Sequence, residues 1–320
     1  MKNDRIKLIE RPLITLVVCA YNQEKYIKDA VNGAFTQTYT PLEIVLSDDC
    51  SPDSTFEIMR EMARSYKGPH YIKLNRNTSN LGIGGHVACL EKHISGNWVI
   101  LSAGDDVSLP ERARNTFLES ENNKNVKAVA FNFIEINESG AVLSNSHSYE
   151  FAQSDSYNFS TLEARSLLPR CGAVFSYHKK CLSWPTLYPK ECWYEDIVLP
   201  FRAALLGRVI LKSEAMVLHR IFKSRKLPTE RVNHISQVQN AIAECRRSVL
   251  FAKNTSLITQ QEANQLLSYL AWHNYRATLW GDICIEKRVI SRLFKKAILK
   301  TCSMTLFRGF QKVLSSHKSP

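Results

Sequence analysis

Short apolar runs alternate with amphipathic stretches through the first hundred residues. Four runs have the length and aliphatic content of buried strands, namely 13–20, 42–47, 71–74 and 98–101. Between them lie three segments with apolar residues at helical spacing, namely 24–37, 53–66 and a stretch ending near 94. This order predicts an α/β fold, in which a mainly parallel, Rossmann-like central sheet is flanked by helices. In such sheets ligands bind beyond the carboxyl ends of the strands.

The pattern changes in the second half of the chain. Strand-like runs recur at 126–136, 208–212 and 215–221, and a turn at 137–140 leads to a short partner strand. From residue 230 on, only helical periodicity remains, over about 231–253, 259–283 and 286–314. We therefore expect an α/β unit over residues 1–222 and a helical C-terminal region over residues 223–320, with a boundary near 223–228.

Net charge adds a candidate partner. The chain carries a formal charge of +12, and residues 286–320 hold nine Lys and Arg residues against one acid. A basic amphipathic helix at 286–314 fits either peripheral contact with an anionic membrane or packing on the α/β unit with a solvated face. Nucleic-acid binding is not expected, because the basic end has few interleaved aromatics.

The cysteines and the hydropathy of the chain indicate in which compartment the protein is expected. The nine cysteines are dispersed, with no C-x-x-C pair, which predicts reduced thiols and a cytoplasmic protein. We assign none of them a catalytic role. No stretch reaches the length of a membrane span.

Acidic turns follow two of the predicted strands. Asp105 and Asp106 are adjacent after the fourth strand, an arrangement that suits a divalent metal with a phosphorylated ligand or, alternatively, a solvated helix cap. Asp48 and Asp49 follow the second strand and could accept hydrogen bonds from a ribose hydroxyl or a base N–H, or cap a helix.

Two further stretches carry candidate chemistry. The glycine-rich segment 80–86 lacks a Walker Lys-Ser/Thr, but its backbone at Gly82 could meet the nucleotide, or it could be a flexible loop. Glu195 and Asp196 follow two aromatic residues at the start of a predicted helix. They suit a general base with a raised pKa, or acids favoured by the helix dipole.

Five stretches together resemble the family 2 glycosyltransferases, the inverting GT-A kind. They are PLITLVVCAYNQEKYIKDAVNGAFTQTY, LEIVLSDDCSPDST, NLGIGG, LSAGDDVSLPER and YEDIVLPFRAALLG, and the likeness covers about residues 11–221. The resemblance implies transfer from a nucleotide-diphosphate sugar, with a UDP-sugar favoured, to a hydroxyl of a glycan or lipid-linked acceptor. It also implies a role in bacterial surface polysaccharide synthesis, such as O-antigen or capsule, on the cytoplasmic membrane face.

The resemblance also implies roles for individual residues. The turn after the first strand would line the nucleotide pocket with Ala20, Tyr21, Asn22 and Glu24. The turn after the second strand would hold uracil or thymine and ribose with Asp48 and Asp49. Asp105 would bind Mn²⁺ or Mg²⁺ bridging the diphosphate, with Asp106 beside it in the metal site. Asp196 would deprotonate the acceptor, next to Glu195, in a single displacement.

Departures from the family pattern keep two alternatives open. Ala103 replaces the first acid of D-x-D, Cys50 stands where glycine is usual, and Phe222 replaces the histidine of an R-x-H element, while nearby His219 is given no ligand role. A catalytically silent nucleotide-sugar binder acting as an assembly partner is one alternative. A nucleotidyltransferase is the other, although a Gly-rich, Arg- or Lys-bearing triphosphate loop is missing after the first strand.

Overall fold

The computed structural model describes residues 11–123, 125–143, 154–158, 160–161, 171–184, 194–222 and 230–285. Two of the predictions therefore lie outside the described residues, the basic helix at 286–314 and the boundary at 223–228.

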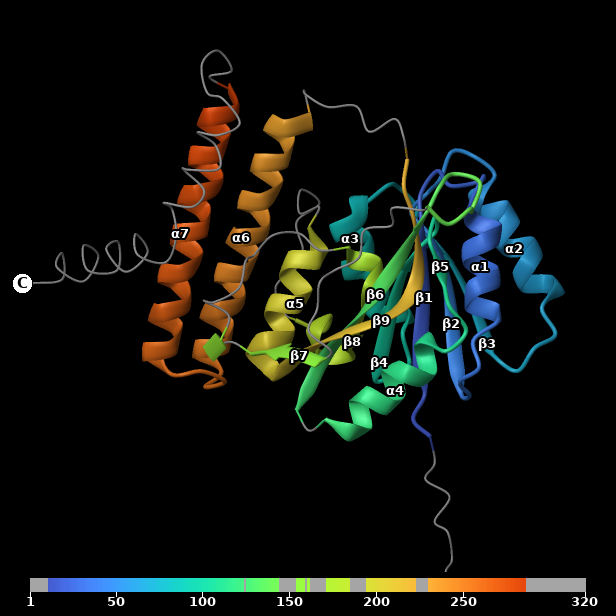
Figure 1. The fold of residues 1–320 in the computed structure, drawn as a ribbon, viewed down its shortest axis with the longest axis horizontal. Helices are drawn as coiled ribbons and strands as arrows, with labels where there is room; N and C mark the ends of the chain where they lie inside the picture. The colour runs from blue at the N-terminus through green and yellow to red at the C-terminus, as the bar shows by residue number, and fades with distance from the viewer. Residues whose placement is uncertain are drawn as a thin grey trace, which may run out of the picture.

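The predicted strands of the first hundred residues form the parallel half of one sheet (Figure 1). These are β1 (Ile14–Ala20), β2 (Leu42–Asp48), β3 (Tyr71–Arg76) and β4 (Trp98–Ala103). β1 lies between β2 and β4, and Ala20 pairs in register with Asp48. The carboxyl ends of these strands therefore meet at one edge, as the fold prediction requires.

The second half of the α/β unit makes the sheet mixed rather than uniformly parallel. It contributes β5 (Val107–Ser108), β6 (Val126–Ile136), β7 (Ser154–Tyr157), β8 (Phe175–His178) and β9 (Arg208–Arg220). β8 runs antiparallel to both β4 and β6, while β6 and β9 are parallel. The main path follows the order β3-β2-β1-β4-β8-β6-β9-β5, with β7 paired to β9.

Helices cover both faces of the sheet, which explains why its central strands are apolar on both sides. On one face, α1 (Ile27–Phe35), α2 (Thr55–Ser65) and α4 (Arg112–Asn122) pack on a cluster that includes Leu16 and Val18. On the other, α3 (Gly82–Cys89) and α5 (Glu195–Leu206) pack on a cluster that includes Val17 and Val99. Alternate residues of one strand thus serve two cores.

Two long helices follow the α/β unit. α6 (Glu230–Asn254) and α7 (Gln260–Ile285) stand side by side beyond α5 (Figure 1). Their buried residues, such as Ile242 and Leu266, belong to the same apolar cluster as Val17 on β1. None of the described helices has the length and apolar character needed to cross a membrane.

A buried ion pair ties α6 to α5. Arg202 and Glu244 both have no exposed side-chain surface, and Arg202 Nη2 contacts Glu244 Oε1. Arg202 Nε also donates to Ser248 Oγ at 3.2 Å, and Glu244 Oε2 contacts Arg247 Nη2 at 2.6 Å. The contact fixes the helical region to the helix that begins with Glu195 and Asp196.

We expect Glu244→Gln to destabilise the protein by about 3 kcal/mol, because removing one member of a buried pair leaves the other charge uncompensated. Urea unfolding followed by circular dichroism measures this. Arg247→Ala is the matched control: Arg247 is 46% exposed, so its loss should cost about 1 kcal/mol or less. Equal effects of the two variants would contradict a special role for the buried pair.

Candidate active site

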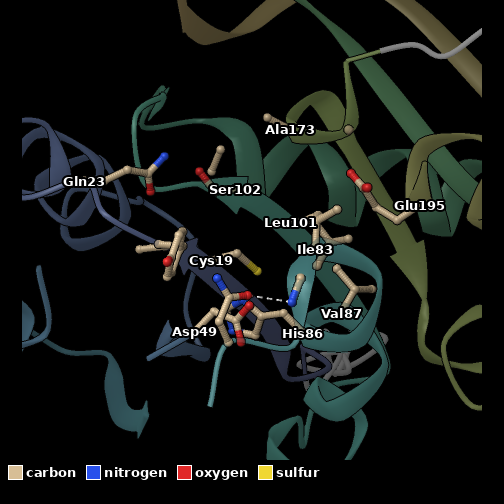
Figure 2. Close-up of a pocket in the computed structure, with 16 residues that line it drawn as sticks. Cys19, Gln23, Asp49, Ile83, His86, Val87, Leu101, Ser102, Ala173 and Glu195 are labelled. Carbon is tan, nitrogen blue, oxygen red and sulfur yellow. Dashed lines mark hydrogen bonds between the residues drawn. The ribbon is translucent and has the colours of Figure 1, made fainter. Parts of the chain in front are cut away.

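A cavity of about 340 Å³ opens beyond the carboxyl ends of β1 and β4 (Figure 2). Its wall combines the turns after β1 and β2, the start of α3, the end of β4, the segment before β8 and the first residue of α5. Five residues predicted for the site line it: Ala20, Tyr21, Asp49, Gly82 and Glu195. The other predicted residues lie behind or beside the wall: Asn22, Glu24, Asp48, Asp105, Asp106 and Asp196.

Asn22 and Glu24 fasten the turn after β1 to the start of α2. Asn22 has a left-handed backbone (φ 57°), and its N–H donates to Ser51 Oγ at 2.9 Å. The Glu24 N–H donates to Asp53 Oδ2 at 3.0 Å, and Glu24 Oε2 accepts from the Ser54 N–H at 3.1 Å. Both residues shape the turn that presents Ala20 and Tyr21 to the cavity.

Asp48 is fully buried and holds the turn after β2. Its Oδ2 accepts from the Ser51 N–H at 2.9 Å and lies 3.4 Å from Arg76 Nε. Cys50 adopts a φ of 63°, the left-handed region in which glycine has no steric cost. This explains why glycine is usual at that position of the family.

Asp49 sits on the cavity wall and organises the segment before α3. Its Oδ1 accepts from Asn77 Nδ2 at 2.7 Å and from the Leu81 N–H at 3.0 Å. Gly82 follows with a φ of 70°, and its N–H donates to Asn80 Oδ1 at 2.8 Å. The glycine-rich stretch is therefore an ordered start of α3 and not a flexible loop.

The two adjacent acids after β4 have different surroundings. Burial, and next the charge of Asp106, raise the pKa of Asp105 to about 6, while a hydrogen bond from Gln23 acts in the opposite direction. A Cβ at Gly104 would lie 2.8 Å from the Ala20 Cβ, so glycine is needed for this turn to pack on the turn after β1.

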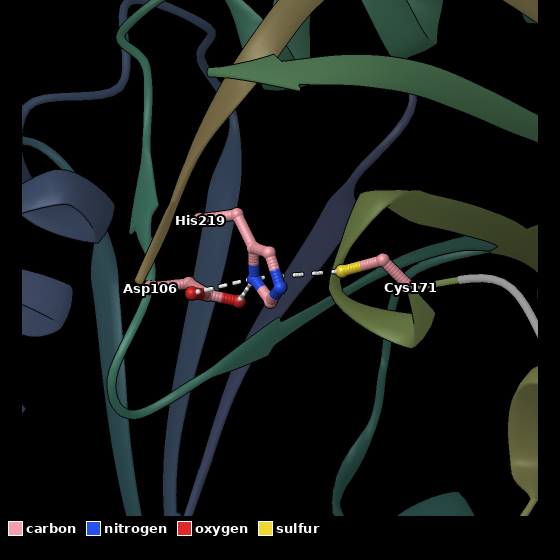
Figure 3. Close-up of side chains that lie close together, drawn as sticks. All are labelled: Asp106, Cys171 and His219. Carbon is pink, nitrogen blue, oxygen red and sulfur yellow. Dashed lines mark hydrogen bonds and ion pairs between the residues drawn. The ribbon is translucent and has the colours of Figure 1, made fainter. Parts of the chain in front are cut away.

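Asp106 is instead buried against His219 (Figure 3). It accepts from His219 Nδ1 at 3.0 Å and from the Arg220 N–H at 2.8 Å. Cys171 Sγ lies 3.7 Å from the same histidine nitrogen. Burial lowers the pKa of His219, but its hydrogen bonds to Asp106 and Cys171 raise it to about 10. The charge of Asp106 is thus matched by an imidazolium.

This difference bears on the predicted metal. The Asp106, Cys171 and His219 ligand atoms lie within 4.8 Å of one another, but thiolate and imidazole suit softer ions than Mn²⁺ or Mg²⁺. Asp105 fits a hard cation better. Beside it, Gln23 Oε1 is buried and has no hydrogen-bond partner in the described part of the chain. A carboxylate and an amide oxygen are ligands of the kind these cations take.

Two arginines position the acidic turn, and their roles were not predicted. Arg220 Nε donates to the Asp105 carbonyl oxygen at 2.9 Å, and its Nη2 reaches Asp29 Oδ2 at 3.0 Å. The fully buried Arg112 donates to the Leu101 carbonyl oxygen at 3.0 Å and to that of Phe175 at 3.2 Å. Arg112 therefore joins the end of β4 to the first residue of β8.

Glu195 lies across the cavity from Asp49 (Figure 2). Burial raises the pKa of its carboxyl to about 7. Gly172 lies directly behind the Glu195 carboxylate, and a Cβ at this position would displace Glu195 Oε1. Asp196 follows in the first turn of α5, next to the cavity wall but not part of it.

The fold is shared with solved GT-A enzymes. S. aureus TarS 1–349 in complex with UDP superimposes with a TM-score of 0.59 at 16% identity, over 82% of this chain and 72% of that one. A mannosyltransferase from Pyrobaculum calidifontis in complex with GDP-Man and Mn²⁺ gives a TM-score of 0.56 at 15% identity, over 96% and 84%. These likenesses concern the fold alone.

The sequence identifies the family. Residues 15–180 match Glycosyl transferase family 2, and the chain belongs to this family, as the motifs predicted. An uncharacterized glycosyltransferase of Haemophilus influenzae is 30% identical over 39% of this chain and 38% of its own length. A putative teichuronic acid biosynthesis glycosyltransferase, TuaG of Bacillus subtilis, is 29% identical over 21% and 27%. The chain matches less than half the length of each relative.

We expect the free energy of unfolding of the Glu195→Gln variant to increase relative to that of the wild type as pH rises from 4.5 to 7. The folded protein holds the Glu195 proton more tightly than the unfolded chain, so wild-type stability from this group is full below pH 4.5 and is lost by about pH 7. The gain should be at most a few kcal/mol, since each pKa unit is worth about 1.4 kcal/mol. Melting temperatures of both proteins from pH 4.5 to 8 test this, and a constant difference would refute it.

Proposed function

We propose that this chain is an inverting glycosyltransferase that moves a sugar from a nucleotide-diphosphate sugar to a hydroxyl of a glycan or lipid-linked acceptor. The observation that carries the proposal is the cavity at the carboxyl ends of β1 and β4, with Asp49 on one wall and Glu195 on the opposite one. A nucleotide held near Asp49 would direct its sugar toward the start of α5.

The donor is a UDP-sugar in this proposal. TarS has been solved with UDP and with UDP-GlcNAc, which supports a nucleotide-sugar donor for the shared fold, whereas the mannosyltransferase was solved with GDP-Man. In the turn after β1, Ala20 and Tyr21 would line the nucleotide pocket. Asn22 and Glu24 would support it by holding the turn in place. Asp49 and Gly82 would face the base and ribose, with Asp48 fixing the turn behind them.

The chemistry would be a single displacement at the anomeric carbon. Asp196 takes the proton of the acceptor hydroxyl as its oxygen attacks, and the nucleoside diphosphate leaves from the opposite side. Adjacent Glu195, whose pKa is raised, faces the donor and hydrogen-bonds to it. Two neighbouring acids in different surroundings can serve separate roles in this way.

A divalent cation, Mn²⁺ or Mg²⁺, would neutralise the charge that develops on the leaving diphosphate. Asp105 would hold it, supported by Gln23. Asp106 would act behind Asp105, because its oxygens are engaged by His219 and the Arg220 N–H.

The acceptor is proposed to belong to a bacterial surface polysaccharide such as O-antigen or capsule. The name of TuaG, a relative tied to teichuronic acid biosynthesis, supports this class of product. The basic residues of 286–320 would bring the enzyme to the anionic cytoplasmic membrane face, where lipid-linked acceptors are found.

Calorimetric titration with UDP, dTDP, GDP and CMP, each with and without Mn²⁺, tests the donor site. We expect UDP to bind in a metal-dependent way and Asp105→Asn to weaken that binding at least tenfold, because the variant removes the carboxylate from the cation. Glu111→Gln is the control, since Glu111 is an exposed acid on the same segment that bonds Thr38 and Arg114. If none of the four nucleotides binds, the transferase proposal is refuted.

Turnover of UDP-sugars, followed by UDP release, separates an enzyme from a silent binder. We expect Asp196→Asn to lower the rate at least 100-fold, within the range that general base catalysis contributes, while the Kd for UDP stays within threefold. Glu195→Gln should act mainly on donor affinity. Activity of Asp196→Asn within tenfold of the wild type would exclude Asp196 as the base, and donor binding without turnover in the wild type would favour the silent binder.

A further inference from the structure

A chain of hydrogen bonds runs behind the cavity wall from Asp49 to His86. Asp49 Oδ1 contacts Asn77 Nδ2 at 2.7 Å, and Asn77 Oδ1 contacts Asn75 Nδ2 at 3.2 Å. Asn75 Nδ2 also contacts Ser47 Oγ at 3.0 Å, and Ser47 Oγ contacts His86 Nε2 at 2.7 Å. The chain links a residue of the turn after β2 to a histidine on α3, and both of its ends line the cavity.

The carboxylate of Asp49 determines which group donates and which accepts in each of these hydrogen bonds. A carboxylate only accepts, so Asn77 must present its NH₂ group to Asp49 and its oxygen to Asn75. Asn75 must then donate both to Asn77 and to Ser47. Since the Ser47 oxygen accepts from Asn75, its own proton can go only to His86 among these partners.

His86 is therefore held as the tautomer with its proton on Nδ1. Its Nε2 accepts from Ser47, and burial of the ring lowers its pKa, which keeps the imidazole neutral. Within the described part of the chain, Nδ1 has no hydrogen-bond partner, and the ring, 2% exposed, borders the cavity (Figure 2). This N–H is therefore available to donate to an acceptor of a ligand bound in the cavity.

We propose that His86 Nδ1–H donates to a carbonyl oxygen of the nucleobase and so selects uracil or thymine, the bases that the family resemblance implies for the turn after β2, over cytosine. The inference rests on the donor site proposed above. Asp49 accepts the ring N3–H, while His86 Nδ1–H donates to a neighbouring carbonyl oxygen. Cytosine in the same pose would turn N3, an acceptor, toward the carboxylate and, where uracil has O4, an NH₂ donor toward the histidine. Both contacts would then be repulsive, which is how a polar site rejects a close analogue.

Calorimetry with UDP and CDP in the presence of Mn²⁺ tests this on the full chain. We expect the wild type to bind UDP at least tenfold more tightly than CDP. His86→Phe, which keeps a planar ring without the donor, should weaken UDP binding about tenfold and reduce the preference below threefold. His93→Phe is the matched control. His93 lies seven residues further on, in the 3-10 helix Leu90–His93, does not line the cavity and should keep the full preference.

Ser47→Ala provides a second route that leaves His86 in place. It removes the hydroxyl that directs the ring, so the preference for UDP should fall at least threefold, while melting curves report whether each variant is folded. An unchanged ratio in a folded His86→Phe or Ser47→Ala variant overturns the role of His86, as does equal binding of UDP and CDP by the wild type. Failure of the wild type to bind any nucleoside diphosphate would instead overturn the proposed donor site, and the inference with it.

Discussion

The burial of Asp106 is the constraint on which the geometry around the acidic turn depends. A carboxylate with 2% exposure is costly unless it is paired and hydrogen-bonded. His219 and the Arg220 N–H meet that demand, and both come from the end of β9. The pairing of β5 with β9 brings them there, with Val107 opposite Leu218. The strand that ends the α/β unit thus positions a turn more than a hundred residues earlier.

One consequence is that two adjacent aspartates are chemically distinct. The positive charge of His219 offsets the negative charge of Asp106. Burial therefore raises the pKa of the neighbouring Asp105 more than repulsion by Asp106 does, and this pKa reaches only about 6. Asp105 can then still ionise near neutral pH and attract a cation. Two carboxylates that were both unpaired at this turn would instead hold a proton between them.

The sequence foretells the parts of the site that depend on local pattern. Apolar runs located β1, β2 and β4, and parallel strand order then placed Ala20, Asp49 and the acidic turn at one edge of the sheet. The antiparallel strands β5 and β8 cannot be predicted in this way, because β5 has two residues and β8 has four, too few to show a period. Without β5 and β9 in register, nothing in the sequence brings His219 to Asp106, so the histidine was given no role. The role of Arg112 cannot be predicted for a related reason. It donates to backbone carbonyl oxygens, which every residue has and which therefore give no sequence signal.

The charge of the cavity follows from the same arrangement. Ala103, where the family has an acid, makes the wall between the two ends of the cavity neutral. Asp49 remains at one end with its oxygens shared with Asn77 and Leu81, and Glu195 remains at the other with a raised pKa. Arg112 lies buried behind the wall and donates to the Leu101 carbonyl oxygen of β4. In the function proposed above, the diphosphate of the donor would meet fewer fixed negative charges in this space than a complete D-x-D would present.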